Sequence, residues 1–396
     1  MIGPVVVAGG GIGGLALGIA LRRHGVEVTV VERATEFGEV GSGVVLAPNA
    51  MSALTALGGE VATRVRAEGS ALGTWGATGH CSPFVTAAGR QLAGVSFDRT
   101  EERWGVPVVS MLRARLQRVL LDEARACGVG LRTGTAVTGY TDHGAHVELL
   151  LAEGEPVTGD LLVGADGLRS AVRRQLLADG EPSYRGYSAV RGTGPAPDAY
   201  PDGFIAYGRG LILFASPIGG GELYWAASIA SPAGVWPAKD RQTAHHDLLE
   251  LLAGWDTELA SVVGKADPAA YVLTDIADRD PVPSWHRGRV VLLGDAAHPM
   301  VYTMGQGAGT TLEDAVVLAH HLVTADGLDA ALGRYEAERT VRTARIQKQS
   351  RMLGRIGHVK GRPAVWLRDR MMALMDRVGG DPEKQDAEVF GWRPPR

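Results

Sequence analysis

The first residues of the chain alternate between short apolar runs and a run with helical spacing. Residues 4–8 are a short apolar run with three β-branched valines at its centre, and residues 15–21 place leucine and isoleucine at the spacing of a helix face. Residues 28–31 are a second β-branched run, which ends at Glu32. This order predicts a strand, a helix and a second strand, the βαβ unit from which parallel sheets are built.

Two later runs have the same strand character. Residues 161–163 and 290–293 are apolar, and each leads into a glycine-containing turn with one aspartate, Asp166 in the first and Asp295 in the second. If both runs join the sheet of the first βαβ unit, both aspartates follow the ends of parallel strands. That edge is where doubly wound sheets bind their ligands.

Between these two runs the pattern changes to short strands separated by glycine and proline. Residues 204–207, 211–215 and 223–227 are predicted to be neighbouring strands joined by tight turns. An antiparallel sheet is therefore expected, and residues 70–98 have the same turn-rich character. From about residue 310 to 324 the apolar positions return to helical spacing.

Glycine is the outlier of the composition, with 55 of 396 residues. The first βα turn carries G-x-G-x-x-G at Gly9, Gly11 and Gly14. In this motif the first glycine permits a tight turn, the second lets the backbone approach a pyrophosphate, and the third lets helix and strand pack closely. Glu32 is placed to accept hydrogen bonds from a ribose diol, which favours FAD or NAD over a 2′-phosphorylated cofactor. The motif alone does not separate FAD from NAD.

The two later turns make the pattern specific. Residues 164–167 read G-A-D-G and residues 294–299 read G-D-A-A-H-P. In order, spacing and wording the three segments resemble the fingerprints of the FAD-dependent aromatic hydroxylases, also called group A flavoprotein monooxygenases, over at least residues 4–335. Residues 32–50 resemble the salicylate-hydroxylase-like and zeaxanthin-epoxidase-like branches of that family.

The resemblance implies an α/β fold in which a Rossmann-like FAD-binding domain is interleaved with a mostly antiparallel β-sheet substrate domain, followed by C-terminal helices. The expected FAD-binding domain is discontinuous and comprises residues 1–70, 99–180 and 276–335. The expected substrate domain comprises residues 71–98 and 181–275. Residues 336–396 are expected to form the C-terminal helical segment.

The resemblance also assigns roles to residues near FAD. Asp295 would bind the ribityl chain, Asp166 would shape the floor shared by FAD and NAD(P)H, and Arg113 is preferred to Arg115 as the arginine that reaches the flavin. The loop before the 310–324 helix would place a helix N-terminus at the flavin N1–C2=O edge. The implied FAD-binding residues are Gly9, Gly11, Ile12, Gly13, Gly14, Glu32, Arg33, Val44, Arg113, Asp166, Asp295, Pro299, Gly305, Gly307, Ala308 and Gly309.

The substrate site is less clearly marked. Arg191 lies where relatives often have W-R-G, with Val190 in place of the tryptophan. It would face the flavin with the substrate or nicotinamide carrier, or else pair with a carboxylate at a strand edge. The residues assigned to catalysis are Arg191, Pro299 and Tyr207. The aromatic residues that would either line the substrate pocket or belong to the sheet core are Tyr207, Phe214, Tyr224 and Trp225.

Composition excludes several other functions. A net charge of −4 gives no reason to expect nucleic acid. Only two cysteines occur, and the adjacent histidine pairs lack metal-ligand spacing, so no metal is predicted. The uncharged stretch 3–21 contains seven glycines and has no preceding basic residue, so neither a membrane span nor a signal peptide is expected. The protein is expected to be cytoplasmic and a monomer or homodimer.

The resemblance predicts an NAD(P)H-driven monooxygenase in which reduced FAD and O2 form a C4a-hydroperoxide that hydroxylates a small aromatic, heteroaromatic or polycyclic substrate. The alternatives are an epoxidase or antibiotic-modifying hydroxylase of the same fold, and a FAD-binding protein that traps an intermediate without turnover. A halogenase is disfavoured because W-x-W-x-I-P is absent.

One feature of the C-terminal segment stays open. Residues 339–377 hold eleven lysines and arginines against two aspartates. This run could dock on a membrane surface, attract NAD(P)H or simply be the wet face of a helix along the FAD-binding domain, which we favour.

Overall fold

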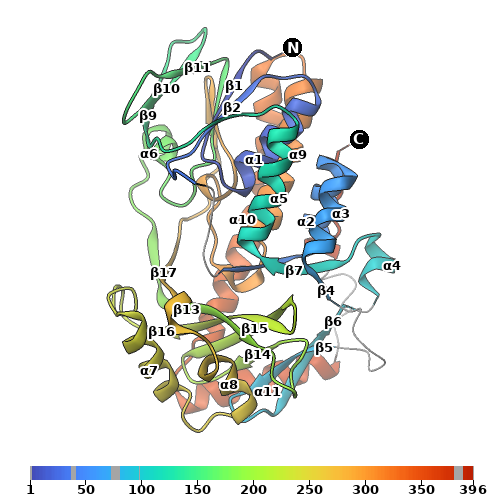
Figure 1. The fold of residues 1–396 in the computed structure, drawn as a ribbon, viewed down its shortest axis with the longest axis vertical. Helices are drawn as coiled ribbons and strands as arrows, with labels where there is room; N and C mark the ends of the chain where they lie inside the picture. The colour runs from blue at the N-terminus through green and yellow to red at the C-terminus, as the bar shows by residue number, and fades with distance from the viewer. Residues whose placement is uncertain (1, 37–41, 73–80, 98, 379–386, 396) are drawn as a thin grey trace.

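The structure is a computed structural model that describes residues 2–36, 42–72, 81–97, 99–378 and 387–395. Two sheets dominate it, one in each half of the molecule (Figure 1). Residues 37–41 of the family-like segment 32–50, and residues 73–80 and 98 of the expected substrate domain, lie outside the described part of the chain.

The six-stranded sheet has the order β18-β19-β12-β1-β2-β8 and is parallel except at β18. β1 lies at its centre and is buried along its whole length, as its run of β-branched residues predicts. Its strands are β1 (Val5–Ala8), β2 (Val28–Val31), β8 (Gly130–Arg132), β12 (Leu161–Gly164), β18 (His286–Arg287) and β19 (Val290–Leu292). The prediction that 161–163 and 290–293 join the first βαβ unit is confirmed.

Helices α1 (Ile12–Arg23), α5 (Arg113–Ala126) and α9 (Gly307–Thr324) pack together beside this sheet. The small residues of α1 bring it close to its neighbours, because a Cβ on Gly13 would lie 2.6 Å from side-chain carbons of Leu293 and Thr311. The other helices and short 3-10 turns on this side are α2 (Pro48–Leu57), α3 (Gly59–Glu68), α4 (Thr100–Trp104), α6 (Ala171–Leu177), η2 (Gly294–Ala296) and η3 (Tyr302–Met304).

The seven-stranded sheet has the order β17-β13-β16-β15-β14-β5-β6, and all its pairings are antiparallel except β14 with β5. The three strands predicted from short apolar runs are β14, β15 and β16. Its strands are β5 (Cys81–Thr86), β6 (Gln91–Ser96), β13 (Ser183–Pro195), β14 (Phe204–Tyr207), β15 (Leu211–Gly219), β16 (Glu222–Ala230) and β17 (Val272–Asp278). One face is covered by α7 (Arg241–Leu251), α8 (Thr257–Gly264) and the short turn η1 (Pro268–Ala270).

Two smaller sheets complete the fold. β7 (Val108–Leu112) lies between β3 (Gly43–Leu46) and β4 (Ser70–Leu72), and β10 (Val147–Leu151) lies between β9 (Val137–Asp142) and β11 (Val157–Gly159). The sheet of β3, β7 and β4 lies between the half that contains the six-stranded sheet and the seven-stranded sheet, because β7 contacts both α5 and β15.

The helix α10 (Leu328–Gly357) joins the two halves. Near its start Tyr335 is fully buried, and its hydroxyl donates to the carbonyl of Leu292 in β19. At its end Gly357 packs against Ile212 of β15. The last long helix, α11 (Arg362–Val378), packs against β6. The expected domain boundaries at 275 and 335 therefore fall inside β17 and α10. No helix in the described ranges has the length and apolar composition needed to cross a membrane.

Candidate active site

A cavity of about 500 Å³ lies where the two halves meet, and all three predicted fingerprints border it. From the six-stranded side it is lined by the first residues of α1, by the turn after β12 and by the turn after β19. From the other side it is lined by residues of the seven-stranded sheet and by His358, which follows α10. Segments that lie up to about 350 residues apart in sequence therefore form one site.

The first turn has the geometry expected of a pyrophosphate cradle. Gly9 has φ of +105°, and a Cβ there would lie 2.4 Å from the carbonyl oxygen of Ala165. A Cβ on Gly14 would lie 1.9 Å from the carbonyl oxygen of Gly9. Gly11, in contrast, has open space on its Cβ side. Gly9 and Gly14 thus serve chain packing, and Gly11 with Ile12 and Gly13 borders the cavity.

Glu32 lies at the end of β2 beside this cradle. Its carboxylate accepts hydrogen bonds from the N–H of Gly10 (2.8 Å) and the N–H of Ala34 (3.0 Å). These two hydrogen bonds fix the position of the carboxylate. Each oxygen has a second lone pair, so the carboxylate can still accept a hydrogen bond from a ribose hydroxyl. Arg33 is exposed, and Val44 of β3 lines the cavity.

The structure separates the two candidate arginines of α5. Arg113, the first residue of the helix, lines the cavity, and its N–H donates to the carbonyl of Ser42. Arg115 points away from the cavity, since its guanidinium donates to the carbonyls of Glu68 and Ile218. Of the two arginines, Arg113 is therefore the one that borders the cavity.

Asp166 is not itself in the lining of the cavity. Its carboxylate accepts from the Ser170 hydroxyl and from the N–H groups of Ala171 (2.7 Å) and Val172 (3.3 Å), so it caps the N-terminus of α6. Burial raises the pKa of Asp166 despite these hydrogen bonds. Its neighbours Ala165 and Gly167 border the cavity, which means that Asp166 shapes this wall through the turn it holds.

The third turn opens directly into the cavity. Gly294 has φ of +62°, and a Cβ there would lie 2.8 Å from the Thr311 side chain. The next residue, Asp295, is exposed and lines the cavity. The start of α9 packs against this turn, and Gly305, Gly307 and Ala308 are also in the lining. The positive end of an 18-residue helix therefore faces the cavity.

Two residues of this segment lie behind the lining. Gly309 faces α2, where a Cβ would lie 2.9 Å from the amide nitrogen of Asn49. Pro299 is buried, and its carbonyl accepts a hydrogen bond from Gln347 of α10 (2.8 Å). Neither residue is part of the lining, and the chain leaves the cavity after Asp295 and returns to it only at Met300.

A buried group of charges holds this turn in place. Asp314 of α9 accepts from the N–H of Gly294 (3.1 Å), from His298 Nε2 and from Arg339 Nε (2.7 Å). All of these side chains are nearly or fully buried. Burial opposes ionisation of Asp314, but the charges of His298 and Arg339 outweigh it and hold the pKa of Asp314 below its ordinary value. His298 therefore supports the turn and is not in the lining of the cavity.

The substrate side is built from alternate residues of neighbouring strands. Arg191 (β13), Tyr207 (β14), Phe214 (β15) and Tyr224 (β16) all line the cavity. The Arg191 guanidinium donates to the Thr274 hydroxyl (2.8 Å) and lies 5.3 Å from the ring centre of Tyr302. Arg191 thus faces the cavity, and its hydrogen bond goes to a hydroxyl on β17.

Trp225 differs from the expectation that it lines the pocket. It follows Tyr224 in β16, so its side chain points to the opposite face of the sheet. There it is 0% exposed and packs edge to face on Tyr271, with ring centres 5.0 Å apart. Trp225 is a core residue under α7 and α8.

Three polar residues of the cavity were not predicted from the sequence. Ser228 of β16 hydrogen-bonds to Nε2 of His358 (2.7 Å), and Nδ1 of His358 lies 2.7 Å from the carbonyl oxygen of Gly354. The ring of His358 stacks on Tyr187, with ring centres 4.1 Å apart. Tyr302 completes this group at the cavity wall. No motif marks these residues, because they meet only through the packing of α10 on the sheet.

The tautomer of His358 follows from its partners. A carbonyl only accepts hydrogen bonds, so Nδ1 carries the proton and Nε2 accepts from the Ser228 hydroxyl. Burial lowers the pKa of His358, because a charged ring would lose water here. The site therefore holds a neutral imidazole whose Nε2 is a hydrogen-bond acceptor.

These residues fit FAD. The Gly11 side is open where a pyrophosphate would approach, and the backbone N–H groups at the starts of α1 and α9 face the same cavity as Asp295. A side chain at Gly9 or Gly14 would collide with backbone atoms of these turns, so both positions require glycine. The cavity continues without interruption from these turns to the aromatic residues of the sheet.

The sequence matches the FAD binding domain family over residues 3–201 and 209–350. The chain belongs to this family, and specifically to the group A flavin monooxygenases. It is 39% identical over 378 residues to aurachin C monooxygenase/isomerase of Stigmatella aurantiaca, covering 94% of this chain and 95% of the relative. It is 35% identical to 3-hydroxybenzoate 6-hydroxylase 1 of Aquipseudomonas alcaligenes, covering 94% and 93%.

Solved structures agree with this membership. HpxO of Klebsiella pneumoniae, in complex with FAD and uric acid, superposes with a TM-score of 0.85 at 28% identity, covering 95% of this chain and 94% of that one. A FAD-dependent monooxygenase is therefore the class of enzyme to which this fold and this site belong.

Proposed function

We propose that this protein is an NAD(P)H-dependent monooxygenase that hydroxylates a hydroxyl-bearing aromatic or heteroaromatic ring. The observation that carries the proposal is that one cavity is lined both by the three glycine-containing turns of the FAD fingerprints and by Ser228 and His358. Relatives whose names specify hydroxylated benzoates, and a structure that contains uric acid, support an electron-rich ring as the substrate class.

Bound FAD supplies activation of O2 and transfer of one oxygen atom to the ring. The chain holds the cofactor through the turns at Gly11, Ala165 and Asp295, with Arg113 as a further candidate contact. Reduced flavin carries negative charge, and the N-terminus of α9 with its unpaired N–H groups stabilises negative charge next to it. The buried group around Asp314 keeps that helix end and the Asp295 turn in register.

The Ser228 and His358 pair accounts for recognition of a ring hydroxyl. A substrate O–H that donates to Ser228 Oγ can pass its proton through the serine hydroxyl to His358 Nε2. The resulting oxyanion raises the electron density of the ring, which favours attack on an electrophilic oxygen. Arg191, which faces the same cavity, is placed to stabilise that negative charge.

The test combines flavin binding with turnover. Purified protein is expected to show a flavin spectrum and to oxidise NADH or NADPH faster when phenols or hydroxylated heteroaromatics are added. Labelled O2 is expected to place one oxygen atom in the product. A protein that binds no flavin contradicts the proposal. A protein that binds flavin and ligand without incorporating oxygen supports the alternative of a binding protein without turnover.

A further inference from the structure

The outer face of α11 is apolar, which is the reverse of an ordinary surface helix. Leu367, Met371 and Leu374 recur at four and three residues, so they share one helix face, and they are 52%, 52% and 59% exposed. Met375 and Trp366 flank them at 64% and 61%. Of the twelve large apolar side chains exposed in the described part of the chain, eight lie between residues 352 and 375.

The inner face of α11 shows why the helix presents this side to solvent. Arg368 is only 4% exposed, and its guanidinium donates to the carbonyls of Gly208 (2.9 Å) and Gly357 (3.1 Å). It also pairs with Asp369 and lies over the ring of Tyr207. A buried, hydrogen-bonded arginine fixes the rotation of the helix, and the apolar residues are thereby held outward.

Basic residues surround the apolar face. Within the described residues, the exposed lysines and arginines of this region that form no ion pair are Lys348, Arg355, Lys360, Arg362, Arg370 and Arg377. The two aspartates of α11 are engaged, because Asp369 pairs with Arg368 and Asp376 accepts from the N–H of Gly94. The face therefore combines apolar area with uncompensated positive charge.

We propose that α11, with the exposed apolar residues at the end of α10, docks on a phospholipid surface that carries anionic headgroups. An amphipathic helix with leucine, methionine and tryptophan on one side and arginine beside them binds in this way. A second copy of the chain fits less well, because a two-fold interface would place this basic face against itself. The complementary charge favours the anionic lipid surface.

The position of this face links the membrane to the cavity. The turn between α10 and α11 contributes His358 to the lining, and Arg368 contacts Tyr207, which also lines it. If the proposed function holds, the wall of the substrate cavity next to α11 lies at the lipid surface. Binding to vesicles is measured without substrate, so its failure is distinguishable from failure of the proposed reaction.

The experiment is sedimentation of the full FAD-loaded chain with vesicles of phosphatidylcholine, with or without phosphatidylglycerol. We expect binding only to the anionic vesicles, weakened by added salt. The double variants L367E/L374E and R370Q/R377Q are each expected to lower vesicle binding at least about tenfold, in line with the contribution of each buried or charged group. The matched controls are V341E, at an apolar residue 70% exposed on α10, and R174Q on α6.

Three results would overturn the proposal. The first is equal binding of L367E/L374E and wild type to anionic vesicles while both retain FAD. The second is no binding of the wild type to them. The third is a wild-type dimer in light scattering that L367E/L374E converts to a monomer, because it assigns the face to a second copy.

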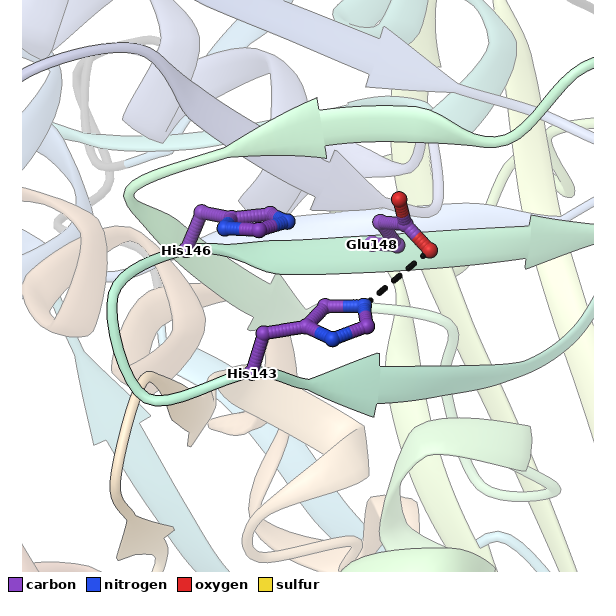
Figure 2. A group of neighbouring side chains, drawn as sticks. All are labelled: His143, His146 and Glu148. Carbon is purple, nitrogen blue, oxygen red and sulfur yellow. Dashed lines mark ion pairs between the residues drawn. The ribbon is translucent and has the colours of Figure 1, made fainter.

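A separate observation concerns the hairpin between β9 and β10 (Figure 2). The N–H of His143 donates to the carbonyl of His146 (2.9 Å) across a turn in which Gly144 has φ of +79°. Glu148 lies two residues beyond His146, so it points to the same face of the strand. His143 Nε2 lies 3.2 Å from Glu148 Oε2, and the two imidazole rings stack with centres 4.6 Å apart.

We infer that this face is a surface site for a divalent transition metal. One ligand atom from each of the three residues lies within 4.8 Å of the others, and two imidazoles with a carboxylate suit Cu²⁺, Ni²⁺ or Zn²⁺. Arg289 anchors the hairpin, because its Nε donates to the Gly144 carbonyl (2.6 Å) and its backbone N–H donates to the Asp142 carboxylate (2.9 Å).

Calorimetric titration of the holoenzyme with CuCl2 tests the site. We expect one Cu²⁺ per chain, and we expect this binding to be lost in H143N/H146N. The control H246N removes an exposed histidine that faces only Glu250. Equal Cu²⁺ binding by wild type and H143N/H146N, with FAD retained in both, would overturn the inference.

Discussion

At the scale of single residues, the three glycines of the first turn have different roles, because Gly9 and Gly14 are enclosed by the chain and Gly11 is not. Gly9 and Gly14 are needed because the chain itself occupies the space a side chain would take. Gly11 faces open space, so its lack of a side chain serves a ligand. The same motif therefore contains fold-determining and cofactor-determining positions.

This difference predicts opposite phenotypes. Gly11→Ala is expected to fold with near-wild-type stability and to lose FAD affinity at least about tenfold, because its methyl group enters the space of the pyrophosphate. Gly14→Ala is expected to be destabilised by several kcal/mol, on the order of 2–4, because its Cβ meets the Gly9 carbonyl. Thermal unfolding of the apoproteins and flavin titration separate the two. Equal stability of both variants would contradict the distinction.

A second residue-scale prediction concerns Ser228 and His358. Ser228→Ala is expected to lower kcat/KM for a phenolic substrate about 10²-fold or more, because general acid–base groups contribute that much. The control is Ser216→Ala, which removes a buried hydroxyl bonded to Ser110 outside the cavity. FAD content should stay unchanged in both. Equal losses in the two variants would assign Ser228 a purely structural role.

The pH dependence of this pair has a definite sign. Because burial lowers the pKa of His358, its ring stays neutral in the folded protein at pH values where a free histidine begins to take up a proton. The wild-type rate is therefore expected to hold to below about pH 6.5 and to fall as pH drops further. Stability also falls there, because the unfolded chain binds the proton more readily. His358→Gln is expected to abolish this limb of the kcat/KM profile.

At the scale of elements, β16 shows how one strand serves two functions. Its even positions Tyr224, Ala226 and Ser228 face the cavity, and its odd positions Leu223, Trp225 and Ala227 face the core. The adjacent aromatic residues Tyr224 and Trp225 consequently have different roles, one in the cavity wall and the other in the core.

Paired substitutions test this alternation. Tyr224→Leu is expected to change KM for the aromatic substrate several-fold with little loss of stability. Trp225→Leu is expected to cost about 2–4 kcal/mol of unfolding free energy, because it empties a fully buried site. Urea unfolding and steady-state kinetics together give the comparison. A KM effect in the Trp225 variant alone would contradict the assignment.

The helix α9 is the second element whose design can be tested. Asp314→Asn is expected to cost about 3–5 kcal/mol, because it leaves Arg339 as a buried charge with less compensation. Since the pKa of Asp314 is lowered in the fold, its contribution is present above about pH 4 and is lost as pH falls through the lowered value. The difference in unfolding free energy between Asp314→Asn and wild type is therefore expected to be smaller at acid pH than at neutral pH. Asp326→Asn, an exposed site after α9, is the control.

At the scale of the whole molecule, the sheets and the fingerprints were predictable because each depends on a local pattern. Short continuous apolar runs mark the strands, and glycine turns mark the expected flavin contacts. Asp166 was harder, because an aspartate after a strand can face a ligand or cap the next helix. The Ser228 and His358 pair could not be predicted, since its members lie 130 residues apart and meet only after α10 packs on the sheet.

The order of the central strands has a consequence for synthesis on the ribosome. β1 pairs with β12, and β12 with β19, so residues 5–8, 161–164 and 290–292 are neighbours in one sheet. β1 can therefore complete its pairing once residues 161–164 have emerged, but β12 keeps an open edge until residues 290–292, nearly three quarters of the way along the chain, have emerged. Such distant pairing slows folding and leaves apolar edges uncovered meanwhile. A chaperone that shields the open edge of β12 during translation is therefore expected to raise the yield of folded protein.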